Sequence, residues 1–337
     1  MIKKIERKSI WLMVLFLMLL FVPATAPAAG KVLLRASGGP VGAGKDFRVQ
    51  MVAEAIRKGN PGWAVDVING PTAIAEVAMI GQGALQFGAL DAAGITQVAK
   101  GHYYGTKLPK PVKLRWLLPS TAMTTVFYLL KDVPINSFGE LKEKKYPLKF
   151  SAIRKGSDPY NITRTVLETY GYSYKDILSW GGKMQNTASR RSADLMADGL
   201  MAGFMLSGTY PVSAVAELAR KREIKAIFVS EPEIQGKLLK QGFIRIPIKA
   251  GSYNFVKNDT TTVAMPALIV VAEDMSDESA YNMTRAVWEQ RKDLLYPLHR
   301  IFREYLQPEV ISEWGAKFRD WIHPGAEKFW KEKGLLK

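Results

Sequence analysis

The stretch Val32-Leu-Leu-Arg-Ala-Ser-Gly-Gly-Pro-Val-Gly-Ala-Gly-Lys-Asp-Phe47 holds the pattern that decides the fold. A short β-type run at 32–36 passes through a glycine-rich turn into an amphipathic helical pattern at 47–58. The alternation continues with a strand at 64–68, a helix at 72–80 and a strand at 85–88. This β-α-β-α-β order is typical of a parallel, layered α/β domain.

The middle of the chain repeats this order, with a strand at 148–152, a loop at 154–159 and a helix at 160–170. Strand patterns at 124–130 and 263–272 leave and rejoin the first domain, so they supply two hinge segments. The sequence therefore predicts a discontinuous domain I, residues 29–130 plus 260–337, and a continuous domain II, residues 131–259. We expect the ligand in the cleft between them, where loops at the carboxyl ends of parallel strands gather.

The amino terminus has the layout of a secretory signal peptide. Four basic residues precede an apolar run at 10–22, and small residues follow, with cleavage expected after Ala28. An uncleaved anchor is the alternative, but the run is shorter than the ~20 residues that span a bilayer. We therefore assign residues 1–28 to a signal peptide. Because the 337 residues include no cysteine, no lipid-modified cysteine anchors the exported protein, which favours a periplasmic location.

Composition narrows the partners. The formal net charge is +16, but the lysines are scattered and form no arginine-rich stripe, so we expect no nucleic acid partner. A positive field instead raises the on-rate for anionic solutes. The absence of cysteine also excludes disulfides, thiolate metal sites and a cysteine nucleophile.

One motif suggests an enzyme. Gly39 to Lys45 matches the spacing of a phosphate-binding loop, but that loop needs Ser or Thr next and the chain has Asp46. A carboxylate there would repel phosphates and misplace Mg²⁺, so we reject a nucleotide hydrolase. The three histidines have no partner at metal-ligand spacing, and no G-x-S-x-G elbow is present. The sequence thus predicts no catalytic residues, no metal, no cofactor and no enzymatic activity.

The loop at 151–159 occupies the equivalent place in the middle domain. Arg154 is suited to a bidentate contact with a ligand carboxylate, and a solvated surface position is its alternative. Ser157 is placed either to cap the following helix or to contact the ligand.

Three stretches near the carboxyl end carry a resemblance: the valine-rich run at 262–271, the aromatic pattern at 281–288, and Ile322-His-Pro-Gly-Ala326 followed by paired aromatic residues. Together they resemble the TAXI group of solute receptors for TRAP transporters. The resemblance implies a two-domain periplasmic binding protein of the type II, Venus-flytrap-like kind. It also implies a monomeric receptor that delivers its ligand to the membrane subunits of a TRAP-type secondary transporter. A sensor subunit of a signalling system and an exported enzyme are the alternatives.

The resemblance also places the ligand site, with departures from the family pattern. Phe47 replaces one of a pair of tyrosines, Ala89 replaces a glutamine, and the middle-domain loop gains Arg154 and Lys155. Fewer acidic and amide groups and more cations favour a small anionic ligand, a carboxylate, over an amino acid. The expected ligand-binding residues are Ser37, Gly38, Gly39, Phe47, Thr72, Asp91, Arg154, Ser157, Ser207 and Thr209.

Overall fold

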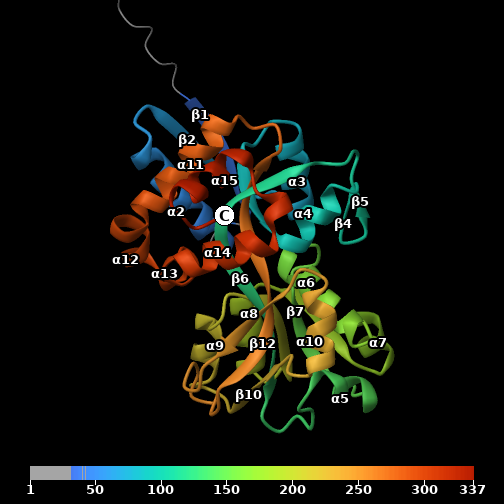
Figure 1. Ribbon diagram of the computed structural model, residues 1–337. Helices are drawn as coiled ribbons and strands as arrows, with labels where there is room; N and C mark the ends of the chain where they lie inside the picture. Colours follow the sequence, from blue (N-terminus) through green and yellow to red (C-terminus); the bar gives the residue numbers. More distant parts are fainter. Residues whose placement is uncertain (1–31, 40, 42) are drawn as a thin grey trace, which may run out of the picture.

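The computed structural model describes residues 32–39, 41 and 43–337, so the predicted signal peptide lies outside the described residues. The chain forms two lobes joined by two long strands, β6 (Leu114–Leu130) and β12 (Thr260–Ala272) (Figure 1). The chain therefore crosses between the lobes along extended strands. Within the described residues, no helix is both long and apolar enough to cross a membrane.

The first lobe contains the β-α-β-α-β unit that the opening stretch predicts. Strand β1 pairs in parallel with β2 and with β3, which confirms the predicted parallel layout. Glycine ends β1, because Gly39 has φ +70° and lets the chain turn toward the next helix. The elements are β1 (Val32–Gly39), α2 (Gly44–Gly59), β2 (Trp63–Asn69), α3 (Ala73–Gly81), β3 (Phe87–Asp91), α4 (Ala92–Val98), β4 (His102–Tyr103) and β5 (Thr106–Lys107).

The second lobe has its own parallel group, since β7 pairs with β8 and β9. Strands β8 and β11 and helix α10 were not predicted, because their short, charge-bearing sequences lack a clear apolar period. The elements are α5 (Phe138–Glu143), β7 (Lys149–Ile153), α6 (Asp158–Thr169), α7 (Tyr174–Ser179), β8 (Lys183–Thr187), α8 (Ser189–Ala197), β9 (Gly203–Gly208), α9 (Ser213–Leu218), β10 (Ile224–Phe228), α10 (Pro232–Leu239) and β11 (Ile244–Ile248).

Strand β6 corrects an expectation, because it begins at Leu114, well before the strand predicted at 124–130, and passes through Pro119. In the structure one strand runs through, and the proline is accommodated by a bulge. Ala267 pairs with Thr121 and Leu268 pairs with Pro119, which leaves Ser120 as the extra residue. A bulge changes the direction in which side chains point, and Ser120, in this bulge, contacts a residue of the site described below.

The carboxyl-terminal helices cover the first lobe (Figure 1). Two tryptophans attach them to β6: Trp116 Nε1 donates to the carbonyl of Phe318 (3.0 Å), and Trp330 Nε1 donates to that of Leu117 (2.9 Å). Gly325 is required there, because a Cβ would lie 2.1 Å from the carbonyl oxygen of Asp277. The helices are α11 (Asp277–Gln290), a π-helix (Arg291–Leu295), α12 (Tyr296–Leu298), α13 (Arg300–Tyr305), α14 (Pro308–Lys317) and α15 (Pro324–Glu332).

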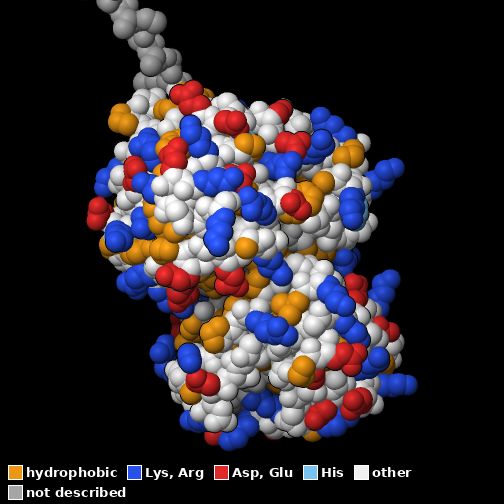
Figure 2. Space-filling view, in the orientation of Figure 1, with side chains coloured by type: hydrophobic (Ala, Val, Ile, Leu, Met, Phe, Trp, Pro, Cys, Tyr) orange, Lys and Arg blue, Asp and Glu red, His pale blue; other side chains and the backbone are white. Residues whose placement is uncertain are grey.

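All the strands except the β4–β5 hairpin belong to one mixed sheet of ten strands, in the order β2-β1-β3-β12-β6-β9-β7-β8, with β10 on β6 and β11 on β12. One large apolar core runs along this sheet through both lobes, and a second core packs on the sheet in the second lobe only. On the face shown in Figure 2, the cationic side chains are spread over both lobes and do not form one stripe.

Candidate functional site

Contacts between the lobes locate the site at the amino end of α6. The hydroxyl of Tyr103, from the first lobe, hydrogen bonds with the carboxylate of Asp158, the first residue of α6. Beside it, Arg164 Nη2 donates to the carbonyl of Tyr104 (2.7 Å). Helix α6 of the second lobe is therefore docked on the β4–β5 hairpin of the first.

The opposite flank of the junction is also bridged. Arg300 Nη2, from α13, donates to the carbonyl of Tyr210 in the second lobe (2.8 Å). Between the flanks, the hydroxyls of Thr121 on β6 and Thr209 after β9 lie 3.2 Å apart. The described structure is therefore a closed arrangement of the two lobes.

Arg48 is the buried cation of the junction, with only 8% of its surface exposed. It lies one turn into α2, and its Nε donates to Ser120 Oγ (3.1 Å), the side chain that the bulge in β6 re-aims. Burial lowers the pKa of Arg48 to about 10, against the opposing influence of the Asp158 carboxylate. Arg48 therefore stays charged at neutral pH in a poorly solvated place, which favours an anion beside it.

Glu76 is a buried anion with its own cation. Only 1% of its surface is exposed, and Lys45 Nζ lies 2.6 Å from its Oε2. Its Oε1 accepts from the amide of Ala89 (3.1 Å). Burial raises the pKa of Glu76, while Lys45 opposes the shift. Gly88 leaves the room for this carboxylate, because a Cβ there would lie 2.2 Å from Oε1.

Asp91 is fully buried at the end of β3, where it caps α4. Its Oδ1 accepts from the amide of Gly94 and from the hydroxyl of Tyr104, both at 2.8 Å, and its Oδ2 lies 2.9 Å from the hydroxyl of Tyr103. Burial, and after it the charge of Asp158, raise the pKa of Asp91 to about 6. Two facing carboxylates thus share one tyrosine.

The cluster therefore joins two cations, three carboxylates and a tyrosine, drawn from α2, α3, β3, β4 and α6. The carboxyl ends of β1 and β3 supply the first-lobe part, as expected for a site at the strand ends of an α/β sheet. We call these residues the inter-lobe cluster: Lys45, Arg48, Glu76, Asp91, Tyr103 and Asp158.

Some predicted site residues adjoin this cluster. Asp91 belongs to it. Ser37 and the two glycines after it are buried at the end of β1, directly before the turn that leads to Lys45. Gly38 packs against the Asp46 side chain, since a Cβ there would lie 2.6 Å from Oδ1. Thr209 lies at the strand crossing, in contact with Thr121.

Other predicted residues have local partners. Thr72 caps α3, its Oγ1 accepting from the amide of Ala75 (3.4 Å). The hydroxyl of Ser207 lies inside the second lobe, 2.7 Å from that of Thr125 and 2.8 Å from that of Thr163. Each of these two hydroxyls therefore has a hydrogen-bonding role within its own lobe.

The contacts of Phe47 and Ser157 are with residues outside the cluster. The Phe47 ring is 38% exposed and lies against His299 (centroids 5.5 Å apart). The side chain of Arg154 is exposed. Ser157 caps α6 by accepting from the amide of Tyr160 (3.4 Å), and its hydroxyl donates to the carbonyl of Arg154 (2.7 Å). The structure thus supports the capping alternative for Ser157.

Five members of the cluster were not predicted as ligand-binding residues: Lys45, Arg48, Glu76, Tyr103 and Asp158. A signal for two of them exists, because Arg48 and Glu76 interrupt apolar helical stripes, and a charge on a buried face needs a partner. The pairing of Tyr103 with Asp158 had no such signal, since the two residues lie 55 positions apart and belong to different lobes.

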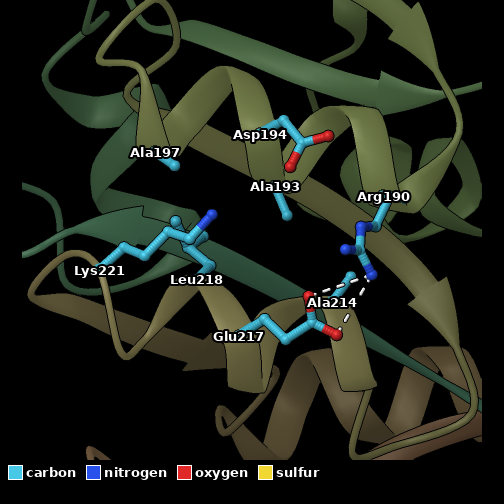
Figure 3. A pocket seen from close by; sticks show the side chains of 8 residues that line it. All are labelled: Arg190, Ala193, Asp194, Ala197, Ala214, Glu217, Leu218 and Lys221. Atoms are coloured by element: carbon cyan, nitrogen blue, oxygen red, sulfur yellow. Dashed lines mark hydrogen bonds and ion pairs between the residues drawn. The ribbon is translucent and has the colours of Figure 1, made fainter.

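A separate hollow lies on the second lobe between α8 and α9 (Figure 3). Its volume of about 10 Å³ has room for about one water molecule. An ion pair between Arg190 Nη1 and Glu217 Oε2 (3.0 Å) crosses it, as Figure 3 shows. It is too small for an organic solute. No group of three potential metal ligands is found among the residues that the structure describes.

The chain matches the model of the NMT1-like family over residues 45–334. The chain belongs to the NMT1-like family. Its fold is similar to the periplasmic binding protein BugD, at 14% identity and a TM-score of 0.51, over 91% of this chain and 99% of that one. It is also similar to a putative sulfonate ABC transporter protein, the periplasmic sulfonate-binding protein SsuA from Methylobacillus flagellatus KT. That match has 12% identity and a TM-score of 0.51, over 91% of this NMT1-like chain and 98% of the other. The two-domain α/β fold of periplasmic binding proteins, predicted from the sequence, is thereby confirmed.

Proposed function

We propose that this protein is a periplasmic solute-binding receptor, rather than an enzyme, that captures a small organic anion between its lobes. The family and the fold support a binding role, and the predicted signal peptide supports the location. The ligand would bind at the inter-lobe cluster, and its carboxylate would pair with Arg48.

The buried Arg48 carries this proposal. Removing a guanidinium from water is costly unless an anion pairs with it. Its Nε is held by Ser120, and no other hydrogen-bond acceptor for the side chain is found among the described residues. A guanidinium fixed in this way leaves its two terminal nitrogens for bidentate pairing with a carboxylate. Lys45 does not compete with Arg48 for the ligand carboxylate, because it is paired with Glu76.

A thermal-shift screen of the mature protein tests the proposal. The panel holds small carboxylates, sulfonates, amino acids and nucleotides. A ligand at about 100 times its Kd should stabilise the folded state by about 2.7 kcal/mol. We expect a carboxylate to raise the melting temperature of the wild type but not that of Arg48→Gln. A hit with sulfonates alone would keep the anion receptor and replace the carboxylate, whereas a hit with nucleotides alone, or none, would contradict the proposal.

We also propose that the receptor delivers its ligand to the membrane subunits of a TRAP-type transporter. The TAXI-like stretches at 262–271 and 322–326 support this partner. Ligand-dependent co-purification with such membrane subunits tests it. Binding instead to a sensor kinase would favour the signalling alternative.

The domain division, 29–130 plus 260–337 and 131–259, remains part of the proposal. Strand pairing suggests where bending occurs, because β6 pairs with β12 up to Thr124 and with β9 from Thr124 onward. We therefore place the hinge on β6 near Thr124 and on β12 near its partner Ala264. Closure by such a hinge would bring Asp158 and Tyr103 together around the ligand.

A further inference from the structure

The hydroxyl of Tyr103 lies between two carboxylates from different lobes, Asp91 Oδ2 at 2.9 Å and Asp158 Oδ1. A phenol has one hydrogen to donate and can also accept. Burial beside these carboxylates raises the pKa of Tyr103 well above its ordinary value, so the hydroxyl keeps its hydrogen. One hydrogen cannot serve two ionised carboxylates. The closed contact is therefore one hydrogen short unless a carboxylate is protonated.

The surrounding hydrogen bonds show which oxygen would carry the extra proton. Asp91 Oδ1 already accepts from the amide of Gly94 and from the hydroxyl of Tyr104, whereas Oδ2 faces only the Tyr103 hydroxyl. A proton on Oδ2 of Asp91 would donate to Tyr103, which in turn would donate to Asp158. Each of these three groups then has a suitable hydrogen-bond partner.

We infer that closure of the two lobes takes up one proton from solution, held on Asp91 and shared through Tyr103 with Asp158. The receptor thus has a proton-binding site that exists only when the second lobe docks. Opening removes Asp158, leaves the hydrogen of the Tyr103 hydroxyl to Asp91 Oδ2, and releases the extra proton to water. The inference concerns the closed form and does not depend on the identity of the ligand.

The backbone conformation supports a specific proton-binding site at Asp91. Tyr104 has φ +45°, a conformation that residues other than glycine adopt rarely, and its amide donates to Gln97 Oε1 (2.6 Å). The turn therefore holds both tyrosines on Asp91 despite an unfavourable backbone conformation. The charged and titratable groups that face the pair come from four elements and the turn after β4: Arg48 on α2, Glu76 on α3, Tyr103 on β4, Tyr104 after it, and Asp158 and Arg164 on α6.

The sign of the pH effect follows. The pKa of Asp91 is raised to about 6 in the closed structure, above its ordinary value, and desolvation is the largest cause. A raised pKa stabilises the closed form most at low pH, and this contribution is lost as the pH rises through about 6. Between the ordinary pKa of an aspartate and about 6, the ratio of closed to open molecules should fall by up to about tenfold per pH unit for one linked proton, and above about 6 it should level off.

Spin labels can follow the lobes, because the chain has no cysteine and two can be introduced as Lys107→Cys and Lys240→Cys, both exposed positions. In the ligand-free protein we expect the short inter-lobe distance to become populated as the pH falls from 8 to 5. Tyr103→Phe removes the bridge and leaves Asp158 without its hydrogen-bond donor, so it should depopulate the short distance across this whole range. Asp91→Asn, whose amide donates permanently, should keep the lobes closed throughout this range.

Tyr104→Phe is the matched control, because it removes a hydrogen bond to Asp91 but leaves the bridge to Asp158. It should keep the pH response and move its midpoint upward. Circular dichroism checks that each variant is folded. Asp158→Asn replaces any variant that is not, and like Asp91→Asn it should keep the lobes closed throughout the pH range. Wild-type distances that do not change with pH, or an unchanged response in Tyr103→Phe or in Asp91→Asn, would overturn the inference.

Discussion

The two lobes present similar strand-to-helix loops to the junction, but the charges on these loops point in opposite directions. After β1, Lys45 and Arg48 lie in the first turns of α2, and their side chains point into the protein. In the loop after β7, Arg154 and Lys155 precede α6 and are exposed to solvent. Of the three charged residues from Arg154 to Asp158, only Asp158, the first residue of α6, is buried.

This difference shows that position relative to the start of the helix decides which charges enter the site. A cation near a helix amino terminus is opposed by the helix dipole, so burying one there requires an anion. Lys45 has that anion in Glu76. Arg48 feels the charge of Asp158, and we propose that the ligand supplies its direct partner. The anionic Asp158, in contrast, is favoured where it lies, at the amino end of α6.

The largest expected effect separates the two loop arginines. Arg48→Gln should weaken the binding of a carboxylate ligand by about 100-fold or more, because an ion pair to a buried charge is lost. Arg154→Gln, the matched control on an exposed side chain, should change the affinity by less than about threefold. Isothermal titration of both variants checks this. Equal losses would mean that the loops do not differ as we describe.

The next effect tests the packing behind the first-lobe charges. Gly88→Ala should destabilise the fold by about 1–3 kcal/mol, because its Cβ would overlap the carboxylate of Glu76. Gly236→Ala in α10 is the control, since nothing lies within 4 Å of the added Cβ and alanine favours a helix. Urea unfolding measures both. A Gly88→Ala protein as stable as the wild type would show that Glu76 is not fixed as the structure has it.

The smallest effect concerns the second-lobe loop. Ser157→Ala should cost about 1 kcal/mol of stability through loss of the helix cap, with little change in ligand affinity. Ser157→Asp should restore most of the stability. If affinity falls while the melting temperature of the free protein stays constant, Ser157 contacts the ligand instead of only capping the helix.

The hydrophobic periodicity of the sequence and the order of its strands and helices made the fold predictable, but the site was predictable only in part. The alternation of strand and helix patterns from Val32 to Gly88 identified the parallel layout, because each pattern depends only on residues that are close together in the sequence. The bulge at Ser120 could not be foreseen, since Pro119 breaks a strand as readily as it bends one. Asp91 was predicted through the family resemblance. Tyr103 and Asp158 were not, because their contact depends on how two lobes dock.

A crystal structure of the protein with the carboxylate that binds most tightly in the screen tests the central claim most directly. We predict closed lobes, with the ligand carboxylate within hydrogen-bonding distance of both terminal nitrogens of Arg48 and enclosed by the inter-lobe cluster. A ligand bound outside this cluster, on Arg154 or on the surface of one lobe, would contradict the account.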